Sequence, residues 1–223
     1  MYIDLGLSMR AGVRIGDRMN LSLMGSIWRP TIVGLLMLTL AACFPTSEHP
    51  IALNGEADVP DIFTGIWEGG LGDGQATLIF MEQASESRGT PRFHGLIIRH
   101  KEGKPSINEG WLEFEAEAAQ IRGEIFLSAL LKRLDGKPTE IDERGYYLFR
   151  VQMNGDDMSV TGLDDLVTIE LINRGALEGT ISRSVGLPIV RLRGDGISLR
   201  AFIVNADLDE VFSEPFAAFT RQK

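Results

Sequence analysis

The sequence predicts a mainly β fold, either a single curved antiparallel sheet or a small barrel, with one or two short helices near the C-terminus. From residue 62 onward, apolar and polar residues alternate mostly with a period of two, which is the side-chain period of a β-strand. About eight short segments of this kind follow at near-regular spacing, as in β-sandwiches and barrels. Polar or glycine-containing turn sequences separate them, so neighbouring strands are expected to be mostly antiparallel.

The candidate segments for these strands are, in chain order, residues 64–70, 75–82, 92–100, 110–117, 120–128, 146–153, 157–162, 176–183, 188–194 and 215–221. The alternation is clear in segment 110–117, where Leu112, Phe114 and Ala116 alternate with glutamates. Because successive side chains of a strand point to opposite faces, this strand is expected to have one apolar and one acidic face.

Two local features are predicted within this sheet. Asn154-Gly155 separates two alternating segments, and this dipeptide strongly favours a tight hairpin turn. On the acidic face, Glu113 or Glu115 is expected to pair with Arg122 of the next strand. An exposed cross-strand pair of this kind stabilises a sheet by only about 0.2–1 kcal/mol.

Two helices are predicted in the last third of the chain. Segment 163–175 has β-branched residues that favour a strand, but its ends favour a helix. Asp164 suits the N-cap, Arg174 the last turn and Gly175 the position after the C-cap, so we predict a helix here. A second short helix is predicted within 197–212, where apolar residues recur at helical spacing.

A hydrophobic run without charged residues, 31–42, precedes the β-rich part. A membrane-spanning helix needs about 20 apolar residues, so this run is too short to cross a bilayer. It has the length of the apolar core of a secretory signal, about 7–15 residues, and Arg29 supplies the positive flank. The run ends at Cys43, the only cysteine of the chain.

The motif Leu40-Ala41-Ala42-Cys43 resembles the lipobox of bacterial lipoproteins. This resemblance implies cleavage between Ala42 and Cys43 by the lipoprotein signal peptidase. It also implies a diacylglycerol thioether on the Cys43 sulfur and acylation of the new amino terminus. A lone cysteine fits this chemistry, because the lipid attachment consumes it.

The chain is therefore expected to have three parts: a signal peptide over 1–42, a lipidated flexible tether over 43–61, and a β-rich domain over 62–223. Three prolines and little periodicity after the cysteine predict the tether. The polar region before the hydrophobic run is long for such leaders, so we expect the true start at Met19 or Met24.

Charge and the residue after the cysteine bear on location and partners. The lipoprotein resemblance implies that Phe44, in place of aspartate, directs the protein to the outer membrane, facing the periplasm. The formal net charge of −9 disfavours nucleic-acid binding, because phosphate backbones repel an acidic protein. Membrane attachment is expected through the lipid anchor alone.

Gly65-Ile66-Trp67, on the first expected strand, is similar to the Gly-x-Trp motif of lipocalin-like barrels. The resemblance implies that Trp67 plugs the base of a barrel and that Arg221, on the last strand, stacks on its ring. The stretch from Gly145 to the C-terminus is also similar to small uncharacterised bacterial lipoproteins. That second resemblance supports the predicted helices and implies no activity.

No motif predicts catalysis or metal binding. His49 lies in the expected tether, and His94 and His100 share one strand about 20 Å apart, at about 3.3 Å per residue, so they cannot share a metal there. No serine stands in a Gly-x-Ser-x-Gly elbow, and the carboxylate groups fit a solvated strand face, a turn and a helix start. We expect no cofactor and no metal, and an enzyme is only the third hypothesis.

Aromatic residues provide the leading functional hypothesis, which is an apolar pocket inside the barrel that binds a small molecule or lipid. The candidate pocket residues on the expected strands are Trp67, Phe80, Phe93, Trp111 and Phe126, and Tyr146 and Phe149 also lie on strands. The alternative is a protein–protein interaction module that docks its acidic face on an envelope partner.

Overall fold

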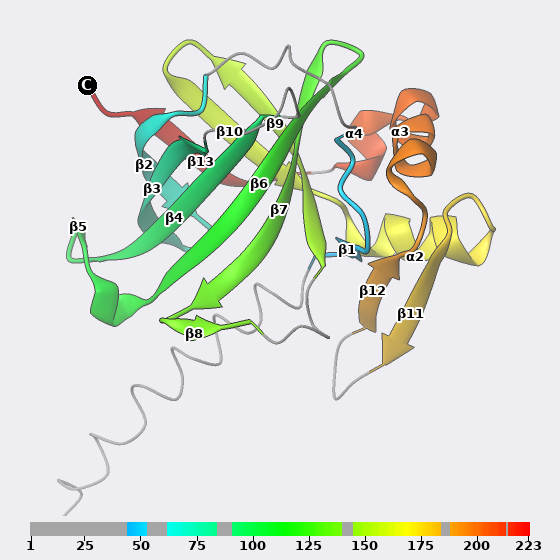
Figure 1. The fold of residues 1–223 in the computed structure, drawn as a ribbon, viewed down its shortest axis with the longest axis horizontal. Coiled ribbons are helices and arrows are strands. Elements are labelled where there is room, and N and C mark those ends of the chain that lie inside the picture. The colour runs from blue at the N-terminus through cyan, green and yellow to red at the C-terminus, as the bar shows by residue number, and fades with distance from the viewer. Residues whose placement is uncertain (1–43, 53–61, 84–90, 140–144, 184–187, 213) are drawn as a thin grey trace, which may run out of the picture.

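The computed structural model describes residues 44–52, 62–83, 91–139, 145–183, 188–212 and 214–223. Within these residues, eight antiparallel strands close into a barrel, so the mainly β prediction is confirmed, and the barrel alternative holds rather than the open sheet (Figure 1). The barrel strands are β2 (Gly65–Leu71), β3 (Gly74–Gln83), β4 (Arg92–Lys101), β6 (Trp111–Ile121), β7 (Glu124–Leu134), β9 (Tyr146–Asn154), β10 (Asp157–Gly162) and β13 (Pro215–Arg221).

Each barrel strand pairs with the next barrel strand along the chain, and β13 pairs with β2 to close the ring. This connectivity is that of an up-and-down barrel, which leaves no unpaired sheet edge in the ring. The strands β5 (Lys104–Pro105) and β8 (Lys137–Pro138) and the 3-10 helix η1 (Ile107–Glu109) extend the loops at one end of it.

Tight turns with left-handed residues join several barrel strands. The Arg122-Gly123 turn, with φ values of 58° and 82°, joins β6 to β7, so the expected strand 120–128 is a hairpin and that prediction is wrong. Left-handed pairs of this kind match the right-handed twist of the flanking strands. The hairpin predicted at Asn154-Gly155 is confirmed, and Gly155 has a φ of 63°.

One end of the barrel is closed by a packed aromatic plug. Trp67 is fully buried, and its indole N–H donates to the carbonyl oxygen of Phe63 at 2.8 Å. The guanidinium carbon of Arg221 lies 4.6 Å from the centroid of the Trp67 ring. The Arg221 side chain also donates to the carbonyl oxygen of Ile62. The stacking of an arginine on this tryptophan, which the lipocalin resemblance implied, is therefore present.

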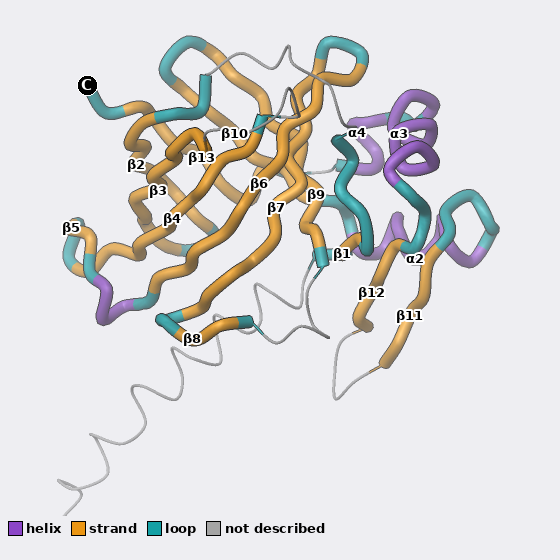
Figure 2. Tube along the Cα trace, viewed as in Figure 1, coloured by secondary structure: helices purple, strands orange, loops and turns teal. Residues whose placement is uncertain are grey.

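The chain between β10 and β13 forms a layer on the outside of the barrel (Figure 2). Its elements are α2 (Asp165–Asn173), β11 (Gly179–Arg183), β12 (Pro188–Leu192), α3 (Gly196–Asn205) and α4 (Leu208–Val211). A second core joins them to outward-facing residues of the barrel, among them Ile121, Phe126 and Leu148. None of the helices in the described part of the chain is long and apolar enough to cross a membrane.

The helix predictions hold with one correction. Asp164 caps α2, because its side chain accepts from the Val167 N–H at 2.9 Å, and Gly175 has the left-handed φ expected after the C-cap. The predicted helix 197–212 is in fact two helices. Ala206 leaves the helix with a ψ of 153°, and the Asp207 side chain caps α4.

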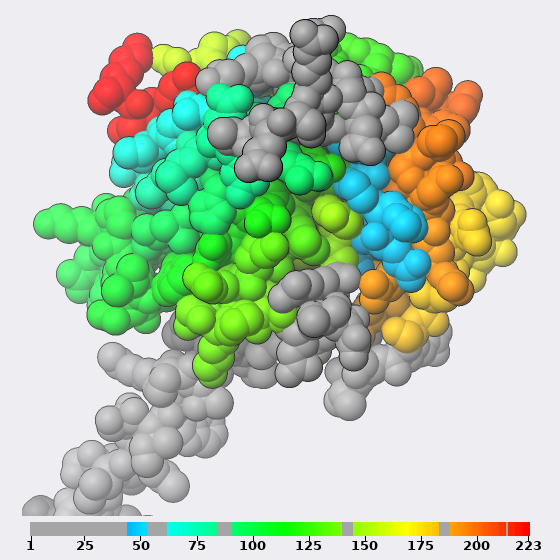
Figure 3. Space-filling model, in the orientation of Figure 1, coloured from blue at the N-terminus to red at the C-terminus, as the bar shows by residue number. Residues whose placement is uncertain are grey.

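Part of the expected flexible tether belongs to the folded domain. Strand β1 (Thr46–Ser47) pairs with β9 and with β12. Ile51 is buried, and its N–H donates to the Ser128 hydroxyl at 2.9 Å. Figure 3 shows this segment, in blue, between the barrel strands and the helices. The prolines predicted a spacer, but apolar residues among them are buried, so along 44–52 that prediction is wrong.

The acidic face of β6 is neutralised by basic residues on the neighbouring strands. Glu113 contacts His94 at 3.4 Å and Arg133 at 3.2 Å. Lys132 and Arg92 pair with the two other glutamates of this face, at 3.1 and 3.0 Å. Arg122 instead donates to backbone carbonyl oxygens near the end of α3, so the predicted Arg122 pair is wrong. The β6–β7 turn directs this side chain away from the glutamates.

Candidate ligand-binding cavity

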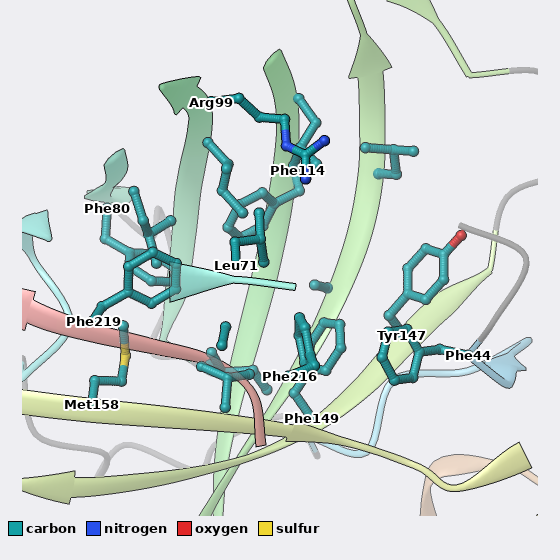
Figure 4. Close-up of a pocket in the computed structure, with 18 of the residues that line it drawn as sticks. Phe44, Leu71, Phe80, Arg99, Phe114, Tyr147, Phe149, Met158, Phe216 and Phe219 are labelled. Atoms are coloured by element: carbon teal, nitrogen blue, oxygen red, sulfur yellow. The ribbon is translucent and has the colours of Figure 1, made fainter. Parts of the chain in front are cut away.

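The barrel holds a cavity of about 170 Å³ at the end opposite the Trp67 plug, and this cavity is partly open to solvent (Figure 4). Its walls are the inward faces of all eight barrel strands, together with Phe44. Every described residue that lines it is apolar except Arg99 and the phenol Tyr147. The described part of the lining contains no carboxylate, histidine or serine, and its titratable side chains are Arg99 and Tyr147.

Aromatic rings pack the inner part of the cavity towards the closed end. Phe80 and Phe114 meet edge to face, with ring centroids 5.6 Å apart. The Phe114 ring lies directly over Gly95 of β4, where a Cβ atom would be only 2.1 Å from the nearest ring carbon. Glycine at position 95 therefore provides the space that the ring occupies.

A second aromatic cluster lines the cavity at the end where β10 finishes and β13 begins. The Phe44 ring lies 4.9 Å from that of Phe216 and 6.2 Å from that of Phe149. It packs on Gly162, where a Cβ atom would come within 2.4 Å of it. Tyr147 stacks on Phe149 with a centroid distance of 6.3 Å. The first residue after the predicted lipidation site thus forms part of the cavity wall.

Among the residues that the structure describes, one charged side chain lines the cavity, that of Arg99 on β4. Its side chain is 11% exposed, and its Nη2 contacts a carboxylate oxygen of Asp73, in the β2–β3 turn, at 3.3 Å. Figure 4 shows the guanidinium beside the apolar lining. A cation in such a lining favours an anionic group at this position, since burying a charge without a partner costs free energy.

The structure places the five predicted pocket residues in three environments. Phe80 lines the cavity. Trp67 and Phe93 are buried inside the barrel but belong to its closed end. Trp111 and Phe126 do not line the cavity, because the alternation along β6 and β7 directs them outward. Phe126 packs instead on Phe212 in the second core, with ring centroids 5.6 Å apart.

Several cavity residues were not among those five. The sequence pattern predicts Phe149 on a strand and Phe114 on an apolar strand face, but it assigns neither residue to the pocket. Once β13 is known to pair with β2, the alternation along both strands places Phe219 on the same, inward face as Trp67. Nothing in the sequence predicts that Phe44 lines a cavity, because no regular pattern of apolar and polar residues surrounds it. Ala42 and Cys43, the predicted cleavage and lipidation sites, lie outside the described residues.

His94 and His100 make ordinary polar contacts. His94 contacts a glutamate of β6, and a ring nitrogen of His100 lies 2.8 Å from the Thr77 hydroxyl. In the described ranges, no group of three or more histidine, cysteine or acidic side chains could hold a metal ion.

The fold and the site together define an up-and-down β-barrel with an internal, partly open apolar cavity. Comparison of the chain with protein-family models, with curated proteins and with solved structures finds no match. The cavity and the predicted lipoprotein signal are therefore the two features on which a proposed function can rest.

Proposed function

We propose that this chain is a lipid-anchored protein of the bacterial cell envelope whose barrel binds an apolar small molecule or lipid. The observation that carries the proposal is the apolar cavity of about 170 Å³. Each methylene group that a ligand buries there contributes about 0.8 kcal/mol. The volume slightly exceeds that of an engineered cavity of about 150 Å³ that takes up benzene, so a ring or a short stretch of hydrocarbon fits.

The leader supports the anchor. Residues 31–42 and Cys43 fit the lipoprotein signal, and Phe44 after the cysteine favours the outer membrane, with the domain facing the periplasm. Phe44 is packed in the cavity wall, and consecutive Cα atoms are about 3.8 Å apart. A lipid on Cys43 would therefore hold the partly open end of the barrel at the bilayer surface, where an apolar ligand is available.

Binding can be tested with two substitutions at neighbouring positions of β13. Ala217 is buried and lines the cavity, whereas Ala218 is exposed on the outer face. In the full chain, Ala217→Leu should weaken binding of the neutral fluorescent probe N-phenyl-1-naphthylamine at least tenfold, and Ala218→Leu should leave it unchanged. Thermal melting controls for folding. Equal affinities in the two folded variants, or no probe binding by the unmodified protein, would contradict the proposal.

The anchor has a separate test. When the gene is expressed in bacteria supplied with labelled palmitate, the unmodified chain should incorporate label and remain in the membrane fraction after a carbonate wash. The Cys43→Ser variant should do neither. If that variant stays with washed membranes, lipidation at Cys43 is not what attaches the protein.

A second candidate function, docking on an envelope protein, is favoured by an apolar patch on the outside of the barrel. Ile66 and Met81 are each 47% exposed, and Ile66 pairs directly with Ile79, which pairs in turn with Leu96. The acidic face is a weaker candidate, since its glutamates have basic partners. An Ile66→Asp, Met81→Asp double variant should lose a specific cross-linked partner in cells and keep its probe binding.

A further inference from the structure

The Arg99 guanidinium at the cavity uses few of its hydrogen-bond donors on other side chains. A guanidinium carries five N–H donors in a planar fork that matches the two oxygens of a carboxylate or phosphate. Among the described residues, the Arg99 side chain hydrogen-bonds only to Asp73, through a single contact of 3.3 Å. Asp73 is 77% exposed, so this pair is weak and can be exchanged for another anion.

The hydrocarbon part of the site limits the size of the ligand. About 170 Å³ of apolar space lies next to this guanidinium. Ligand pockets for drug-sized molecules begin at about 300 Å³, so this smaller, partly open cavity suits one apolar chain or ring system better than two acyl chains side by side. Because the cavity is partly open, the polar end of a ligand can stay at Arg99 while its chain enters.

We propose that the ligand is a single-chain anionic amphiphile, whose hydrocarbon chain occupies the cavity and whose carboxylate or phosphate binds Arg99. This inference rests on the proposed function, because it names the ligand class of the same cavity. Asp73 then competes with the head group for the guanidinium. A bidentate, charge-assisted pair in a partly desolvated site is stronger than the single contact that it replaces.

The test compares three ligands that differ only in the head group. Decanoate, decanol and decyl phosphate are titrated against the full chain carrying Cys43→Ser, by displacement of N-phenyl-1-naphthylamine. Decanoate or decyl phosphate should bind at least tenfold more tightly than decanol, and the stronger of the two identifies the head group. Arg99→Gln should reduce the affinity for the anion at least tenfold and leave decanol unchanged. Asp73→Asn should strengthen anion binding severalfold, because it removes the competing carboxylate.

The outcomes separate two claims: that the cavity binds an apolar ligand, and that Arg99 binds an anionic head group. If decanol and both anions bind equally well, the role of Arg99 is refuted and the apolar cavity stands. If Arg99→Gln weakens decanol as much as decanoate, the effect is structural and the inference fails. If neither the probe nor any of the three ligands binds, the proposed function fails together with it. Should Arg99→Gln not fold, two measurements still test the inference. They are the ratio of anion affinity to decanol affinity in the Cys43→Ser protein, and the change in anion affinity caused by Asp73→Asn.

Discussion

Replacing Gly95 with alanine should both destabilise the barrel and narrow its cavity. The added Cβ would lie 2.1, 2.4 and 2.5 Å from three carbons of the Phe114 ring. Carbon atoms make favourable contacts at about 3.5–4.0 Å, so the ring must retreat by more than about 1 Å. Its edge-to-face contact with Phe80 restricts that movement. Overpacking of this kind costs about 1–3 kcal/mol.

Gly70 provides a matched control on the neighbouring part of the barrel. Neither glycine has a left-handed φ, and a Cβ at Gly70 would have no atom within 4 Å. Both substitutions therefore share the gain of about 0.5–1 kcal/mol that alanine brings over glycine inside a strand. The stability of Gly95→Ala should fall below that of Gly70→Ala by about 1–3 kcal/mol.

Urea unfolding, followed by tryptophan fluorescence, measures this difference through the two transition midpoints. Gly95→Ala should also bind N-phenyl-1-naphthylamine less tightly than Gly70→Ala does, because the displaced Phe114 ring enters the cavity. Surface substitutions that disturb no packing usually change the free energy of unfolding by less than about 0.5 kcal/mol. If the free energies of unfolding of the two variants differ by no more than this, Phe114 does not pack on Gly95 as described.

Two further predictions concern the closed end of the barrel and pH. A double-mutant cycle of Trp67→Leu and Arg221→Met should give a coupling free energy of about 0.5–2 kcal/mol in urea unfolding, and a value near zero would refute the stacking. Burial, and secondarily the charge of Asp164, raise the pKa of Asp165 to about 6 from 3.8. The folded state thus binds this proton more tightly, so stability should fall as pH rises through that window. Asp165→Asn should flatten this slope, and an unchanged slope would refute the assignment.

Local rules were sufficient for most of the secondary structure. Alternation identified the barrel strands because each of them has one face towards the interior. The cap at Asp164 and the left-handed glycine at position 175 defined α2, since both act within a few residues of the chain. The same local view failed at Arg122-Gly123, where a short turn interrupts an apolar pattern that continues on both sides.

The location of the aromatic residues depended on tertiary structure. The outer layer covers one side of the barrel, so β7 is apolar on both faces, and alternation alone cannot tell Leu127, inside the barrel, from Phe126, in the second core. Phe44 is half-buried, against aromatic rings of strands more than 100 residues away in the chain.

The sequence by itself determined that the protein is mainly β and where most strands and α2 lie, and its prediction of a lipoprotein signal over residues 31–43 stays a prediction. Tertiary structure decided that the sheet closes, through the pairing of β13 with β2 and of β7 with β9. It also decided that one end is filled by Trp67 while the other keeps an apolar cavity with Arg99 beside it. Closure and cavity depend on contacts between distant segments, and no local pattern of residues specifies which distant faces will meet.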